Sequence, residues 1–123
     1  MYRIEERPDY LLVEFHHDLD TRQVGAAIRE VMARDGYSGR NDLWVFDVEK
    51  IDLPYSILGD IVALVASLLP EEISGGRTAL VPLRGLVGAM VDEYMLLVEH
   101  LSRPVRSFSD IGRAERWLAG RDT

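Results

Sequence analysis

The stretch from Asn41 to Pro70 is the densest apolar segment of the chain, and it constrains the fold more than any other part. Its first part is LWVFDV at residues 43–48. This run lacks the alternation of apolar and polar residues found in a strand with one solvent-exposed face, and such a run is typical of a strand buried on both faces. Pro54 suits the first turn of a helix. The residues after it are apolar around most of a helical circumference: Ile57, Leu58, Ile61, Val62, Leu64, Val65, Leu68 and Leu69. The stretch therefore predicts a buried strand leading into a buried helix, which Pro70 ends.

The rest of the chain alternates between strand and helix patterns. In chain order, the other predicted elements are strands at 2–5 and 10–16, a helix opened by Asp20 and Gln23 and ended by Gly36, a strand at 78–81, a helix at 86–101, a strand at 105–108 and a final helix capped by Ser109. The order β-β-α-β-α-β-α-β-α predicts an α/β fold with a mainly parallel sheet and crossover helices. Crossovers of one hand would place the second and third helices side by side.

Length, charge and composition exclude several classes of protein. The 123 residues fit one domain spanning 1–123, with no linker or repeat. The net charge of −7 argues against nucleic-acid binding, which depends on clustered Lys and Arg. The absence of cysteine excludes disulfides, thiolate catalysis and cysteine-bearing zinc sites. No apolar leader or membrane-spanning segment is found in the sequence, so we expect a cytoplasmic protein.

Four polar residues at the end of the second predicted strand suggest a metal site: His16, His17, Asp18 and Asp20. Neighbouring residues of an extended strand point to opposite faces, so His16 and His17 cannot easily bind the same ion. We therefore expect no metal and interpret the group as a solvated strand end.

A second candidate site lies where strands lead into helices. Arg84, Gly85 and Gly88 stand at the start of a predicted helix, where bare backbone amides attract anions, although tight helix packing would explain the glycines equally well. Asp47 lies at the end of the central predicted strand, where open α/β sheets bind ligands, or it caps the following loop. No nucleophile motif accompanies the three histidines, so we expect neither an enzyme nor a cofactor.

The segments LWVFDV, RTALV and SFSDIGRAERWL together resemble the SpoIIAA-like family, small bacterial proteins of the STAS or CRAL-TRIO type. The resemblance covers nearly the whole chain. It implies a non-catalytic domain that binds a protein partner or an apolar, lipid-like ligand. An alternative that it also implies is an anti-sigma-factor-antagonist-like regulator phosphorylated at Ser56. A third possibility is a small enzyme with a site near Asp47.

The second and third predicted helices carry more apolar residues than the stripe of about 100° that one side of a sheet covers. The residues in question are Leu64, Leu68, Met90, Tyr94 and Met95. They could cover each other, line a ligand groove or form a homodimer interface. Methionine suits an adaptable surface but also fills cores.

Overall fold

A five-stranded sheet organises the computed structural model of the chain, which describes residues 2–69 and 75–120. The strands are β1 (Tyr2–Glu6), β2 (Leu11–Asp20), β3 (Asp42–Asp52), β4 (Thr78–Pro82) and β5 (Val105–Ser107), and they lie in the order β1-β2-β3-β4-β5. β1 is antiparallel to β2, and the other neighbours are parallel. The predicted mainly parallel α/β fold is confirmed.

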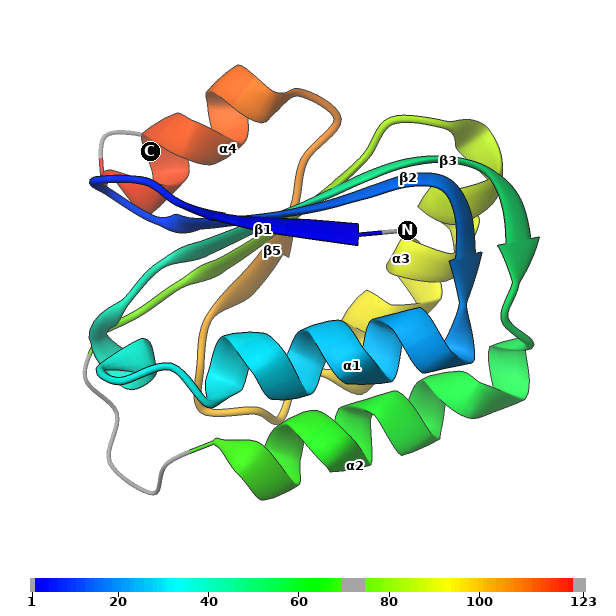
Figure 1. Cartoon of the computed structure of the whole chain (residues 1–123), viewed down its shortest axis with the longest axis horizontal. Coiled ribbons are helices and arrows are strands. Elements are labelled where there is room, and N and C mark those ends of the chain that lie inside the picture. The colour runs from blue at the N-terminus through cyan, green and yellow to red at the C-terminus, as the bar shows by residue number, and fades with distance from the viewer. Residues whose placement is uncertain (1, 70–74, 121–123) are drawn as a thin grey trace.

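Helices cover both faces of the sheet (Figure 1). α1 (Thr21–Met32), α2 (Leu58–Leu68) and α3 (Gly85–Leu97) lie on one face, and α4 (Ile111–Leu118) lies on the other. α2 contacts α3, as the handedness of the crossovers predicted, and it also contacts α1. Two short 3₁₀ turns, η1 (Tyr37–Gly39) and η2 (Tyr55–Ile57), precede β3 and α2. None of the helices within the described residues has the length and apolar character needed to span a membrane.

The central strand β3 is buried on both sides, as its sequence predicted. Trp44 and Val48 pack on the side of α1–α3, whereas Leu43 and Val45 pack against α4 on the other. Successive side chains of a strand point to opposite faces, so a continuous apolar run fills two cores at once.

Local signals set the helix ends, though not always those that the sequence suggested. Asp20 caps α1 as predicted, because its carboxylate accepts a hydrogen bond from the Gln23 amide at 2.8 Å. α1 ends at Met32, so Gly36 does not terminate it; its φ of 74° instead serves the turn before η1. The final helix is capped by Asp110 rather than Ser109, since the Asp110 carboxylate accepts from the amide of Gly112.

α3 is shorter than predicted. It spans Gly85–Leu97 rather than 86–101, and Leu86, the first residue of the predicted helix, is 70% exposed because it lies in the first turn on the outer side. Val87, Met90 and Val91 make the buried stripe instead. Pro70, expected to close the preceding helix, lies outside the described residues.

Candidate functional site

A largely apolar cavity of about 110 Å³ lies between the sheet and helices α1–α3. Its walls come from strands β2 to β5, helices α1–α3, the turn η1, and the residues that follow β3, α2 and α3. The predicted wide apolar surfaces of the second and third helices contribute Ile61 and Val65 from α2, and Val87, Met90 and Tyr94 from α3. The cavity is the principal candidate for a binding site.

Stacked aromatic rings form the sheet-side wall. Phe15 stands opposite Phe46 in the register of β2 and β3, and their ring centroids are 5.3 Å apart with the planes within 5° of parallel. Trp44 stacks on Phe15 from one side at 6.0 Å, and Tyr2 approaches it from β1 at 5.8 Å. Rings on neighbouring strands and the same face meet in this way because their Cβ atoms are about 5 Å apart. Phe15, Trp44 and Phe46 therefore give the cavity an aromatic wall on the side of the sheet.

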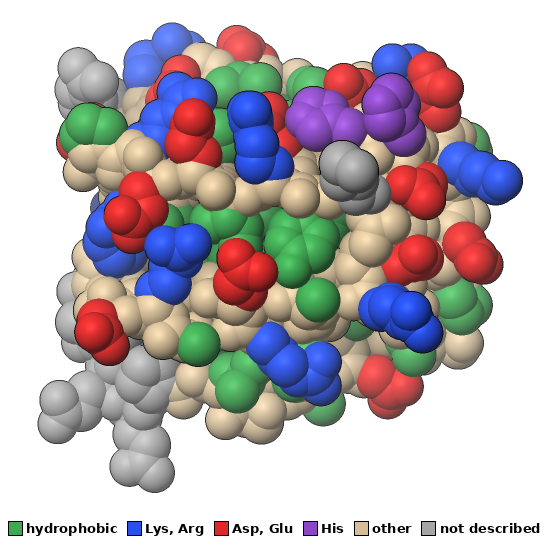
Figure 2. All heavy atoms as spheres, viewed as in Figure 1, with side chains coloured by type: hydrophobic (Ala, Val, Ile, Leu, Met, Phe, Trp, Pro, Cys, Tyr) green, Lys and Arg blue, Asp and Glu red, His purple; other side chains and the backbone are tan. Residues whose placement is uncertain are grey.

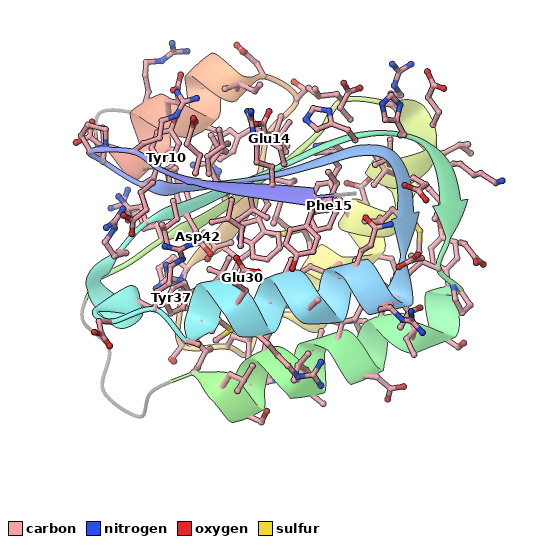
Figure 3. All side chains as sticks on the ribbon, viewed as in Figure 1. Tyr10, Glu14, Phe15, Glu30, Tyr37 and Asp42 are labelled. Carbon is pink, nitrogen blue, oxygen red and sulfur yellow. The ribbon has the colours of Figure 1, made fainter. Side chains whose placement is uncertain are left out.

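A buried polar network closes the cavity at the amino end of β3. The carboxylate of Asp42 is 1% exposed and accepts four side-chain hydrogen bonds. The Tyr37 hydroxyl and the Trp44 indole donate to one oxygen, at 3.1 and 2.8 Å. The Thr78 hydroxyl and the Arg103 guanidinium donate to the other, at 2.6 and 3.2 Å. Figure 3 shows Tyr37 and Asp42 together near this end, and Phe15 farther along the same layer.

The guanidinium of Arg103 also makes several contacts besides its bond to Asp42. Its Nε donates to the Thr78 hydroxyl at 2.8 Å, its Nη2 donates to the backbone carbonyls of Arg40 and Arg77, and its guanidinium lies over the Tyr37 ring, 4.5 Å from the centroid. Burial raises the pKa of the Tyr37 hydroxyl, so this group is neutral at physiological pH. The network is thus a charge-balanced polar plug at one end of an apolar space.

Sequence reasoning missed this network. Asp42 and Thr78 are register partners at the first positions of β3 and β4, and Arg103 comes just before β5. A charged residue at the start of an apolar run, as in Asp42-Leu43-Trp44, was the available signal, but only the strand order shows which cation it meets.

The predicted groove residues fall into two groups. Met90 and Tyr94 line the cavity. Leu64 and Met95 are half-buried against the same core without lining the cavity, and Leu68 is 39% exposed. Contact between α2 and α3 covers part of the apolar excess, while the groove and the homodimer stay predictions for the remainder.

Asp47, Arg84 and His16 come together on the opposite face of the sheet. Arg84 Nε donates to the Asp47 carboxylate at 3.1 Å, and its Nη2 lies 3.5 Å from a carboxylate oxygen of Glu49. His16 lies between Asp47 at 3.8 Å and Glu14 at 3.6 Å. In Figure 2, histidine side chains stand at one end of the visible face among acidic and basic ones. β3 continues to Asp52, so Asp47 does not end its strand; it lies one residue beyond the partner of Pro82, the last residue of β4.

Gly85 and Gly88 are placed as predicted in the first turn of α3, next to Arg84 as the N-cap residue. A Cβ atom added to either glycine would meet nothing within 4 Å. Tight packing, the alternative explanation for these glycines, is therefore wrong. Anion binding at this helix start stays a prediction, and Arg84 already faces two carboxylates there.

The other predicted residues lie on the surface. Ser56 is exposed in η2, two residues before the start of α2. His17 is exposed and has a φ of 69° at an irregularity in the β2–β3 pairing. Within the described part of the chain, no three His, Asp or Glu side chains are grouped so that they could hold a metal ion.

The chain matches no model of a known protein family and no curated protein sequence. Its structure is similar to that of the anti-sigma factor antagonist SpoIIAA in its unphosphorylated form, with a TM-score of 0.53 over 98% of this chain and 99% of that one. The chain has the SpoIIAA fold. At 15% sequence identity the similarity concerns the fold, and it confirms the SpoIIAA-like architecture expected from the sequence segments.

Proposed function

We propose that this protein is a non-catalytic binding domain that takes a small apolar ligand into the cavity between the sheet and α1–α3. The cavity itself carries the proposal. Protein interiors are normally close-packed, and the side chains around a space of about 110 Å³ lack contact partners on that side. An apolar ligand that fills the space would supply those contacts and remove apolar surface from water.

The polar plug supports binding rather than catalysis. The Asp42 carboxylate accepts four hydrogen bonds and pairs with a buried guanidinium, so it is poorly placed to serve as a base or nucleophile. The volume also limits the ligand. An engineered cavity of about 150 Å³ lined by Leu, Ile and Phe binds benzene, so this one suits a single ring or a short alkyl chain rather than an enclosed long acyl chain.

The test is binding of toluene, followed by NMR chemical shifts and by the melting temperature. Val65→Phe should fill the cavity from α2 and abolish binding, because Val65 lines it. Leu64→Phe is the matched control, since the neighbouring Leu64 is half-buried on the same helix without lining the cavity, and it should retain binding. Absence of toluene binding to the folded wild-type protein at saturation would refute the proposal.

A second candidate is a phosphorylation-controlled regulator that binds a protein partner. Two observations favour it: the fold of a known anti-sigma factor antagonist, and the exposure of Ser56 just before α2. A phosphate there would lie near a helix N-terminus, where negative charge is favourable. A phosphate-affinity gel of protein from its own cells should show a shifted band that Ser56→Ala removes; no shifted band under any growth condition would contradict this candidate.

A further inference from the structure

The polar end of the cavity offers no charge to a ligand. Asp42 and Arg103 are both buried and compensate each other, with N and O atoms 3.2 Å apart. Thr78 links them by donating to Asp42 and accepting from Arg103. A charged ligand would have to break one of these bonds or lie buried without a counter-ion, and both are unfavourable.

Tyr94 differs from the other polar residues of the lining. It projects from α3, is half-buried, and makes no hydrogen bond with any described residue. Burial, with a smaller contribution from the Asp42 charge, raises the pKa of Tyr94 to about 12. The hydroxyl is therefore protonated at neutral pH and can both donate and accept a hydrogen bond.

The compensated Asp42–Arg103 pair and the Tyr94 hydroxyl together indicate which ligands the cavity disfavours and which it favours. The closed plug disfavours carboxylates, phosphates and amines, and the aromatic and aliphatic walls favour apolar surface. A polar atom entering this space needs a hydrogen-bond partner, and Tyr94 has its hydrogen-bonding capacity unused by the described residues.

We propose that the ligand is a neutral molecule of one ring or a short alkyl chain with a single hydroxyl or carbonyl group, and that this group hydrogen-bonds to Tyr94. This inference rests on the proposed function, since it requires that the cavity binds an apolar molecule. Phenols, short alcohols and ketones belong to the class, whereas carboxylic acids that ionise at neutral pH do not.

The test compares phenol, toluene and benzoate as probes of similar shape, with dissociation constants measured by NMR titration at pH 7. Phenol and toluene should bind the wild-type protein, and benzoate should bind at least tenfold more weakly than phenol. Tyr94→Phe keeps the ring and removes the hydroxyl, so it should weaken phenol binding about three- to tenfold and leave toluene binding unchanged. Tyr55→Phe is the control, because Tyr55 is 54% exposed and does not line the cavity.

The outcomes separate the two proposals. If toluene does not bind the folded wild-type protein at saturation, the proposed function fails. If toluene binds but Tyr94→Phe affects phenol and toluene equally, or if benzoate binds as tightly as phenol, the cavity is a binding site and the assignment to Tyr94 and neutral ligands is overturned. The benzoate comparison uses the wild-type protein alone, so it decides the question of charge even if Tyr94→Phe fails to fold.

Discussion

Replacing Asp42 by Ala should lower the free energy of unfolding by about 3 to 5 kcal/mol. The Asp42 side chain is almost fully buried, and its loss would leave the guanidinium of Arg103, 7% exposed, without its carboxylate. Breaking a buried pair by removing one member typically costs this much, because the remaining charge stays buried. The donors of Tyr37 and Trp44 would also lose their acceptor. The loss is a large part of the about 5 to 15 kcal/mol that stabilises an ordinary domain.

The assay is urea unfolding followed by far-UV circular dichroism, with the melting temperature as a second readout. The melting temperature of a domain of this size falls by about 4 °C for each kcal/mol lost from the free energy of unfolding. Asp42→Ala should therefore melt about 12 to 20 °C lower than the wild type. Asp47→Ala is the matched control on the same strand. Its carboxylate is 38% exposed and pairs with an exposed Arg84, and such pairs contribute about 0 to 1 kcal/mol.

A double variant tests the physical reason. Arg103→Met added to Asp42→Ala removes both charges, so it should recover part of the lost stability. Two results would refute the reasoning: an Asp42→Ala loss no larger than that of Asp47→Ala, or a double variant whose loss equals the sum of the two single losses.

The remaining predictions concern the core, a helix cap and pH. Trp44→Ala should cost about 3 to 5 kcal/mol in urea unfolding, because it removes a buried aromatic from the stacked wall; an unchanged midpoint would contradict its place in the core. Asp20→Ala should cost about 1 kcal/mol through loss of the α1 cap, whereas Asp35→Ala, at an exposed position after α1, should cost nothing measurable. Burial raises the pKa of Tyr94 to about 12, above its unfolded value near 10, so the folded state holds a proton that the unfolded state loses. This contribution should be fully present below pH 10 and disappear between pH 10 and about 12; urea midpoints across this range should fall less steeply in Tyr94→Phe, and identical slopes would contradict it.

Much of the fold could be predicted because most of its strands and helices are marked by local sequence patterns. Strand and helix patterns alternate, the run at 43–48 is apolar on both faces, and the pair Asp20 and Gln23 marks the start of a helix. Each of these signals acts over a few residues, so tertiary context did not overturn them. The errors came where two local signals competed: Asp110 rather than the adjacent Ser109 caps α4, and α1 ends before Gly36.

The candidate site was harder to predict because it depends on which strands are neighbours. Tyr94 and Met90 were singled out from helical spacing, and both line the cavity. Helical spacing also singled out Leu64, Leu68 and Met95, but these residues do not line the cavity. Apolar composition does not show which side of a wide apolar helix faces the sheet. Asp42 could not be linked to Arg103 from sequence, since 61 positions separate them and the order of the parallel strands brings them together.

The separation of Asp42 from Arg103 also has a consequence for synthesis of the chain. A growing polypeptide that has not yet reached residue 103 lacks the guanidinium that compensates Asp42, as well as the last strand and α4. Packing β3 into a core at that stage would bury a carboxylate without its counter-ion, which strongly disfavours a folded amino-terminal half. We therefore expect that the chain does not fold on the ribosome until β5 has emerged. We also expect that chains truncated before Arg103 form no stable folded fragment.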